Sequence, residues 1–234
     1  MAESRREMAA TPLHTLTAAT PFRFYTSFVL QEATGLRAAT LPQLVQLLRE
    51  VPDSCIYHHT HFFLLSHHYL TPEPANDFAY WVTEVLGEEA LGERLANIDI
   101  LEFDSLEKIR KILVKTIENY LAQHPMARVR FVSEGQEFFF IKSVQVVMPT
   151  EETASSLAEF AESLARVSLS SLYFHIFDAR LRLGRATNDF ARWCEEQLGE
   201  TALAQELVAL DPYAYTLEAL RSMMIALVRQ RLRS

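Results

Sequence analysis

The chain has 234 residues, of which 49% are hydrophobic and 22% charged, and its formal net charge is −8. This length allows one large hydrophobic core or two smaller ones, and the composition is typical of a water-soluble globular protein. The acidic balance argues against nucleic-acid binding, which depends on clustered Lys and Arg, and no apolar run approaches the roughly 18 residues of a membrane-spanning helix.

The start of the chain and its cysteines indicate a compartment. The first residues include acidic side chains and lack the apolar segment of a secretory signal, and the chain has 2 cysteines, Cys55 and Cys194. A disulfide framework is therefore not expected, and we predict a cytoplasmic protein. Residues 1–20 show no periodic pattern and are expected to form a loose N-terminal arm.

The first half of the chain predicts a short strand followed by helices. Aromatic and polar residues alternate from Phe22 to Leu30, which favours a strand, and Gly35 is expected to form a turn. Apolar residues then recur at helical spacing over 41–48, 54–70, 78–86 and 106–120. The helix predicted over 54–70 contains five of the 8 histidines.

Beyond residue 124 the chain again predicts extended segments followed by helices. Residues 128–132 and 137–147 are expected to be extended, with Gly135 at a hairpin turn between them. The sequence leaves open whether the extended segments of the two halves pair with each other or within their own halves. Asn76 and Asn188 are each predicted to cap a helix, with an aspartate in its first turn.

The second half repeats the order of the first. Tyr-x-His occurs at Tyr57 and Tyr173 (173 − 57 = 116), and Asn-Asp-Phe-Ala-x-Trp occurs at 76–81 and 188–193 (189 − 77 = 112). This agreement, with one localised gap, predicts a tandem duplication. We expect a mainly α protein with short β segments, made of two strand-plus-helices units of about 110 residues. The units, 21–124 and 125–234, are expected to pack about a pseudo-twofold axis as one compact domain.

The repeated motifs also resemble a known family. Tyr-x-His, then Asn-Asp-Phe-Ala-x-Trp, Leu-Asp-Pro-Tyr at 210–213 and Leu-Glu-x-Leu-Arg at 217–221 are similar to a bacterial family known as a domain of unknown function. The resemblance extends from about Phe22 to the end of the chain. Because the family has no assigned activity, the resemblance implies no reaction and no catalytic residues.

The histidine-rich segment is the first candidate site. His58 and His61 are three residues apart on a helix, so they could bind a divalent metal with carboxylates from elsewhere in the chain. No strong metal-binding motif such as His-Glu-x-x-His is present. The favoured alternative is a semi-exposed helix whose histidines form hydrogen bonds with neighbours. Apart from this metal, no cofactor is predicted.

The two Tyr-x-His helices form the second candidate site. Their side chains include histidines, tyrosines, a carboxylate and arginines: Tyr57, His59, Tyr173, His175, Asp178, Arg180 and Arg182. If the helices meet at the pseudo-twofold axis, they would line a cleft suited to an anionic ligand; otherwise they are two solvated faces. Asp178 and Arg182 are spaced to form an ion pair on one helix.

The function predicted from these features is binding. The sequence contains no Gly-x-Ser-x-Gly, Walker or Rossmann motif. We therefore expect a non-enzymatic binding or regulatory module whose partner is a protein or a small anionic ligand, without nucleic acid or membrane. The alternative is a metal-binding protein or enzyme with its site between the Tyr-x-His helices.

Overall fold

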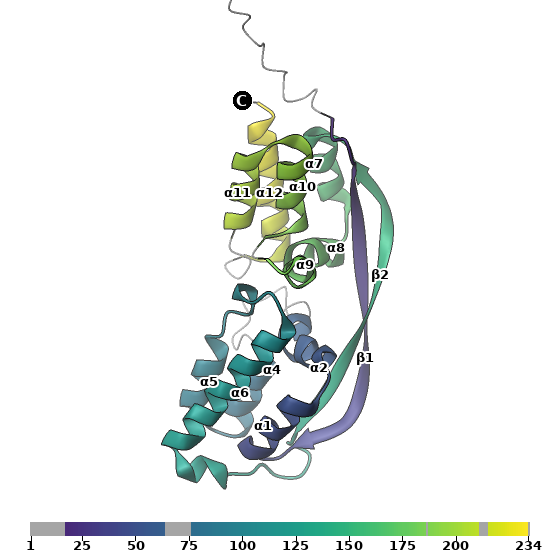
Figure 1. Cartoon of the computed structure of the whole chain (residues 1–234). Helices are drawn as coiled ribbons and strands as arrows, with labels where there is room; N and C mark the ends of the chain where they lie inside the picture. The colour runs from purple at the N-terminus through teal and green to yellow at the C-terminus, as the bar shows by residue number, and fades with distance from the viewer. Residues whose placement is uncertain (1–16, 64–75, 186, 211–214, 234) are drawn as a thin grey trace, which may run out of the picture.

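The computed structural model describes residues 17–63, 76–185, 187–210 and 215–233. Two groups of helices lie one above the other, and a long β ribbon runs along one side of both (Figure 1). The ribbon consists of β1 (Phe22–Ala38) and β2 (Phe138–Ala154), which pair as an antiparallel two-stranded sheet. The fold is therefore mainly α with a small β element, which confirms the predicted class.

The first group of helices lies between the strands in the sequence, and the second group follows β2. The first group contains α1 (Leu41–Glu50), α2 (Asp53–Tyr57), η2 (His58–Phe62), α4 (Asp77–Tyr80), η3 (Trp81–Val85), α5 (Glu89–Ala96), η4 (Ile100–Glu102), α6 (Leu106–Gln123) and η5 (Pro125–Arg128). The second contains α7 (Leu157–Arg166), α8 (Leu169–Tyr173), η6 (Phe174–Asp178), α9 (Ala179–Leu183), α10 (Asp189–Leu198), α11 (Thr201–Ala209) and α12 (Leu217–Arg231). Among the described residues, no helix is both long and apolar enough to cross a bilayer.

The strands differ from the predicted extended segments. β1 continues through Gly35, which has φ 76° and lies where the pairing is irregular, between Ala33 and Arg37. The predicted turn at Gly35 is therefore wrong, because a glycine with positive φ can also fit a bulge inside a long strand. The predicted hairpin around Gly135 is wrong as well, since 128–132 form no strand and β2 pairs with β1 instead.

The pairing of β1 with β2 is symmetric: interchanging the two strands gives the same set of residue pairs. Phe22 pairs with Ala154, Ala38 pairs with Phe138, and Val29 at the centre pairs with Gln145. The strands start 116 residues apart (138 − 22 = 116), so adding 116 to a residue of β1 gives the residue at the same place in β2. The pair Phe22–Ala154 therefore corresponds to Phe138–Ala38, and Val29–Gln145 corresponds to itself. The centre of the ribbon lies at Val29 and Gln145.

The start of β1 completes the core of the second helix group. Phe22 contacts Phe160, Phe190 and Trp193 with ring centroids 5.7, 5.4 and 5.7 Å away. Phe24, which is fully buried, stacks on Phe160. These residues lie in the predicted first unit of the sequence but pack in the second helix group.

The start of β2 has the reciprocal position in the first helix group. Phe138 stacks on Phe78 at 4.9 Å and meets Trp81 edge-on at 5.9 Å, while Phe140 packs beside it. Each group of helices is thus completed by a strand that begins in the other half of the chain. Because aromatic side chains bury large apolar areas, this exchange joins the two groups firmly.

The predicted helix caps are present. Asn76 accepts a hydrogen bond from the Ala79 amide at 2.9 Å and donates one to the Leu95 carbonyl at 3.0 Å. Asn188 makes the equivalent bonds at the start of α10. Of the predicted N-terminal arm, residues 1–16 lie outside the described residues, whereas the Ala18 amide donates to the Ser155 carbonyl at 2.7 Å.

Candidate functional site

Both Tyr-x-His motifs lie where an α-helix widens into a π-helix. α2 passes into η2 after Tyr57, and α8 passes into η6 after Tyr173. Such wide turns are rare in proteins and are frequent at functional sites. His58, His59 and His61 in η2 are between 1 and 5% exposed, so the prediction of a semi-exposed histidine helix is wrong for this part. His67 and His68 lie outside the described residues.

The two Tyr-x-His helices contact each other directly. The Tyr57 hydroxyl donates a hydrogen bond to the Asp178 carboxylate at 2.9 Å, and the Tyr173 hydroxyl donates to the backbone carbonyl of His61. The first bond joins α2 to η6, and the second joins α8 to η2. The tyrosines therefore connect the two groups beneath the ribbon.

Asp178 lies at this contact and is 3% exposed. Its second oxygen accepts a hydrogen bond of 2.5 Å from Gln145, at the centre of β2. Burial raises the pKa of Asp178 to about 6, and burial together with this carboxylate raises the pKa of Tyr57 far above its usual value. The predicted ion pair with Arg182 does not form, because the Arg182 guanidinium donates instead to Asp189 and to the Phe174 carbonyl.

His59 forms two hydrogen bonds that define its protonation. Its Nε2 accepts from the Ile141 amide of β2 at 3.1 Å, and its Nδ1 lies 2.8 Å from Asp77. An amide N–H can only donate, so Nε2 carries no proton and Nδ1–H donates to the carboxylate. His59 is thereby held as one neutral tautomer between the ribbon and the start of α4.

His175 forms the equivalent bonds in the second helix group. Its Nε2 accepts from the Tyr25 amide of β1 at 2.8 Å, and its Nδ1 donates to Asp189 at 2.8 Å. Burial lowers the pKa of His175, although Asp189 opposes that shift. In both histidines the two ring nitrogens are occupied, so neither ring is free to act as a base.

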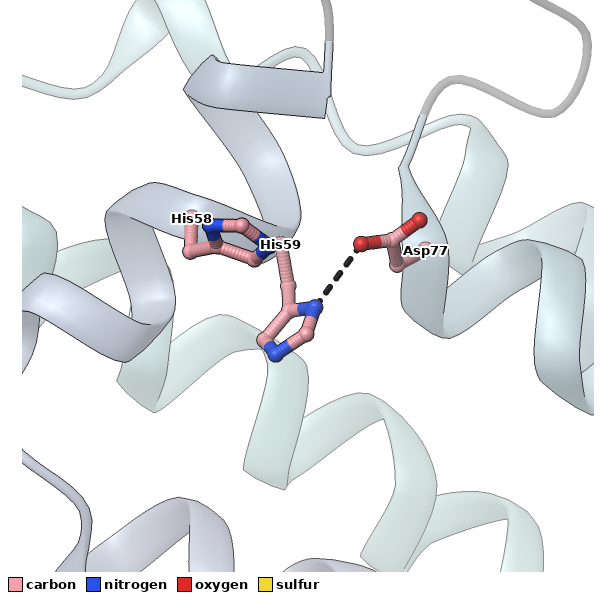
Figure 2. Close-up of side chains that lie close together, drawn as sticks. All are labelled: His58, His59 and Asp77. Carbon is pink, nitrogen blue, oxygen red and sulfur yellow. Dashed lines mark hydrogen bonds and ion pairs between the residues drawn. The ribbon is translucent and has the colours of Figure 1, made fainter. Parts of the chain in front are cut away.

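Figure 2 shows His58 beside His59, with Asp77 facing them from the start of α4. One potential ligand atom from each lies within 4.8 Å of the others. His58 Nδ1 is 2.9 Å from the Ser143 hydroxyl, and burial lowers the pKa of His58 to about 4. A metal bound to Nδ1 of His59 would have to displace the proton that this nitrogen donates to Asp77.

His61, the other predicted metal ligand, has different neighbours. Thr60 donates its hydroxyl proton to the Ile56 carbonyl at 2.6 Å, so the same hydroxyl accepts from His61 Nδ1 at 3.0 Å. Burial lowers the pKa of His61 to about 3, and its ring stacks on Tyr57. The structure thus groups His58 with His59 and Asp77 rather than with His61.

An open cleft of ≈ 810 Å³ lies beside His175, on the side of the second helix group. Its walls come from both strands, η6, α9 and α10. They include three arginines, Arg23, Arg182 and Arg192. The aromatic part of the lining is formed by Phe22, Tyr25, Phe174 and Trp193. Of the predicted cleft residues, only His175 and Arg182 line this cleft; Tyr57, His59, Tyr173, Asp178 and Arg180 do not.

Arg182 is held in place at the cleft wall. It donates to Asp189 at 2.6 Å and to the Phe174 carbonyl at 3.2 Å, and its guanidinium lies 4.1 Å from the centre of the Phe174 ring. Burial alone would raise the pKa of Asp189, but the hydrogen bonds from His175 and Arg182 outweigh it and lower that pKa. The carboxylate is therefore charged and already paired.

The side chains of Arg23 and Arg192 have no hydrogen-bond or ion-pair partner in the described part of the chain. Arg23 is exposed at the start of β1, and Arg192 is half-buried on α10. With Arg182 they give three positive charges in the cleft against the carboxylates of Asp189 and Glu196, so the lining carries 3 − 2 = +1. This surplus contrasts with the net charge of −8 of the whole chain.

Arg23 and Arg192 were not predicted as site residues from the sequence. They are 169 residues apart (192 − 23), and only the crossing of β1 to the second helix group brings them together. A signal was nevertheless present in the comparison of the halves. The equivalent positions hold Phe139 (23 + 116) and Tyr80 (192 − 112), so both arginines are specific to this cleft.

The chain belongs to a family of unknown function, DUF5752, whose model matches residues 19–229. A similar solved structure is that of OrfY from Thermoproteus tenax, with a TM-score of 0.77 and 31% sequence identity. The match covers 92% of this chain and 96% of that one. Among curated proteins there is no significant match. The match confirms the expected relation to a family of unknown function, and the family description names no reaction or ligand.

Proposed function

We propose that this chain is a non-enzymatic binding module, built from a duplicated unit, that holds a small anionic ligand in the cleft beside His175. The observation that carries the proposal is the convergence of Arg23, Arg182 and Arg192 on one cleft, two of them without a partner among the described residues. Arginine is suited to this role because its planar guanidinium can donate two parallel hydrogen bonds to a phosphate or carboxylate.

Recurring contacts support the duplication. The histidine–aspartate bonds of His59 and His175 are equal in length at 2.8 Å. The indole N–H of Trp81 donates to the Gln136 carbonyl, and that of Trp193 donates to the Thr20 carbonyl, at 2.8 and 2.9 Å. Gln136 and Thr20 are 116 residues apart, as are the two histidines. An approximate twofold axis through the centre of the ribbon relates these contacts.

The cleft contains both fixed and unpaired arginines. Arg182 is oriented by Asp189 and Phe174 before any ligand arrives, which lowers the entropy cost of binding. Arg23 and Arg192 keep their charges available for the ligand. The aromatic side chains Tyr25 and Phe174 offer apolar surface beside these charges. This combination suits a phosphorylated ligand that also carries a ring.

The proposal of binding without catalysis follows from the hydrogen bonds of His175. Both of its ring nitrogens are engaged, one by the Tyr25 amide and the other by Asp189. Among the described residues that line the cleft, the hydroxyl groups of Thr20, Thr153 and Ser155 are hydrogen-bonded neither to a histidine nor to the Glu196 carboxylate, so none of them has a base in place. Without a general base, a hydroxyl is a weak nucleophile.

A thermal-shift screen tests the proposal. The panel comprises inorganic phosphate, pyrophosphate, phosphorylated metabolites and nucleotides, at constant ionic strength. A ligand at 100 times its Kd stabilises the folded state by about 2.7 kcal/mol, which raises the Tm of a protein of this size by roughly 5–10 °C. At least one panel member is expected to give such a shift.

Two arginine variants test whether the ligand binds in the cleft. Arg192→Ala is expected to weaken binding by roughly 10- to 100-fold, because a hydrogen bond to a charged group contributes about 1.5–3 kcal/mol. Arg185→Ala is the control, since Arg185 is an exposed arginine just after α9 and does not line the cleft. A panel without any shift, or equal losses in both variants, would contradict the proposal.

A metal site at His58, His59 and Asp77 is the second candidate function. It is favoured by the closeness of their potential ligand atoms, all within 4.8 Å of one another. The bond from the Ile141 amide to His59 weighs against it, because it leaves the proton on the nitrogen that faces Asp77. Metal analysis of protein purified without a histidine tag distinguishes the two functions.

A further inference from the structure

One face of the β ribbon points away from the helices (Figure 1). The side chain of Gln145 reaches inward to Asp178, so its neighbours in β2 point outward. Five apolar side chains on the outward face are between 42 and 61% exposed. We call them the apolar ladder: Phe28, Leu30, Val144, Val146 and Met148. Contiguous apolar patches are rare on monomeric proteins unless they bind something.

The ladder is arranged as cross-strand pairs that end in an ion pair. Phe28 lies opposite Val146, and Leu30 lies opposite Val144. The next outward pair is Glu32 opposite Lys142, with 2.9 Å between the carboxylate and the ammonium group. The face therefore carries one negative and one positive charge and is neutral as a whole.

We propose that the apolar ladder is the interface of a homodimer, in which the ribbons of two copies stack face to face. A twofold axis that runs along the ribbon between the stacked faces exchanges the strands. It places Phe28 over the partner's Val146. It also places Glu32 over the partner's Lys142 and Lys142 over the partner's Glu32. The face is thus complementary to itself in shape, apolarity and charge.

The charge of this face allows a second copy to bind there. Two copies of a chain with net charge −8 repel each other, so a stable contact requires a surface without excess negative charge. The ladder and its terminal ion pair meet that condition. Stacking also buries the outward side chains of the ribbon, whose other face already packs on the helices.

The area of the apolar ladder sets the expected affinity of the dimer. The stretch from Thr26 to Glu32 extends about 23 Å at 3.3 Å per residue, and two strands cover a width of only about 10 Å. This area is smaller than the roughly 800 Å² that each partner buries in a standard interface. We therefore expect a dimer with a Kd of about 1–10 µM rather than a nanomolar one.

Analytical ultracentrifugation of the full chain tests the interface. Between about 1 and 200 µM, the wild type is expected to change from monomer to dimer. Phe28→Glu and Val144→Glu are each expected to remain monomeric, with unchanged circular dichroism. Phe131→Glu is the control, because Phe131 is 75% exposed and lies outside the ribbon. A wild type that is monomeric throughout, or a dimer that Phe28→Glu leaves intact, would overturn the proposal.

Charge reversal tests the orientation of the two copies. Glu32→Lys gives a face with two positive charges and Lys142→Glu gives a face with two negative charges, so neither variant is expected to self-associate. An equimolar mixture of the two variants is expected to form a heterodimer, because each lysine then faces a glutamate. A mixture that associates no better than either variant alone would refute the stacked arrangement.

Discussion

At the scale of single residues, two equivalent histidine–aspartate pairs have different third neighbours. Beside His59 and Asp77 lies His58, which is bonded to Ser143. Beside His175 and Asp189 lies Arg182, which donates to the same aspartate oxygen at 2.6 Å. The pairs attach the helices to the ribbon in the same way. Of the two pairs, only His175 and Asp189 lie at the wall of the cleft. We therefore infer that Arg182, the third residue of this group, accounts for the binding role.

Replacing His58 with phenylalanine, the residue at the equivalent position of the second half, tests whether His58 is a structural histidine or a metal ligand. His58→Phe reproduces the second half, where Phe174 occupies this position and the equivalent Ser27 hydroxyl has no hydrogen-bond partner. We expect the free energy of unfolding to change by less than about 1 kcal/mol in urea denaturation, because the second half folds with this arrangement. Stoichiometric metal in the wild type that is lost in His58→Phe would contradict the structural role.

Replacing His59 in the same way is expected to have a larger effect. His59→Phe leaves the Ile141 amide without its acceptor and removes the hydrogen bond to Asp77. A neutral hydrogen bond contributes about 0.5–1.5 kcal/mol and one to a charged group about 1.5–3 kcal/mol, so the free energy of unfolding should fall by roughly 2–4 kcal/mol in the same denaturation experiment. Equal stability of the His58→Phe and His59→Phe variants would show that the ribbon attachment is not as described.

Asp178 gives a prediction about pH. Its pKa is about 6 in the folded protein against a usual 3.8, so the folded state favours the protonated form. The stability it contributes is complete below pH 3.8 and is lost as pH rises through about 6. Asp178→Asn cannot ionise and can still accept the Tyr57 hydrogen bond. It should therefore be more stable than the wild type at pH 8, by up to about 3 kcal/mol.

The difference in unfolding free energy between Asp178→Asn and the wild type, measured from pH 4.5 to 8, checks this. Asp104→Asn is the control, because the hydrogen bond from Lys108 lowers the pKa of Asp104 below its usual 3.8, so this carboxylate is charged in both the folded and the unfolded state throughout this pH range. The difference for Asp104→Asn should therefore stay constant between pH 4.5 and 8, whereas Asp178→Asn gains relative stability as pH rises. A difference for Asp178→Asn that is constant over this range would refute the buried, ionisable contact.

At the scale of elements, the exchanged strands determine which parts of the chain depend on each other. Phe24 belongs to β1, which is followed by the first helix group, yet it packs on Phe160 and Phe190 of the second. Phe24→Ala is therefore expected to destabilise the protein by about 3–5 kcal/mol. The increase in hydrogen exchange should be greatest in α7 and α10 rather than in α1.

Phe140→Ala is the reciprocal variant for this experiment. Phe140 is buried beside Phe138 and His59, so its removal should raise exchange first in α2 and α4 of the first group. Local opening of contiguous units makes such a difference measurable. If each variant instead loosened the helices of its own half of the sequence, the exchange of strands would be refuted.

The elements also show what the sequence could predict. Helices with an apolar stripe and a polar cap, such as those that start after Asn76 and Asn188, were predictable because the signals lie within a few residues of each other. The length of β1 and its pairing with β2 were not, because partners such as Phe22 and Ala154 are 132 residues apart (154 − 22). Local patterns do not specify such distant pairs.

The candidate site was predictable to a similar degree. His175 and Arg182 were found because they lie on one helix next to a repeated motif. Arg23 was missed because a single exposed arginine at the start of a strand has no local pattern. The π-helical turns were also missed, and they explain why His58 and His61 do not point to one place as α-helical spacing would require.

At the scale of the whole molecule, two similar halves carry different surfaces. The ribbon pairing and the buried histidines fit the proposed twofold relation, whereas the arginine cleft does not, since Phe139 and Tyr80 occupy the positions equivalent to Arg23 and Arg192. A symmetric scaffold with one asymmetric basic cleft favours one bound anion per chain. The neutral apolar ladder lies on the ribbon's outward face and would leave that cleft accessible in a dimer.

The most direct test is a crystal of the full chain soaked in selenate or tungstate and measured at the anomalous edge of the heavy atom. We predict one anomalous peak within hydrogen-bond distance of Arg23, Arg182 and Arg192, and none at the equivalent place beside Phe139 and Tyr80. Crystals of Arg192→Ala should show a weaker peak or no peak. An empty arginine cleft, or anions bound equally in both halves, would contradict the proposed binding function.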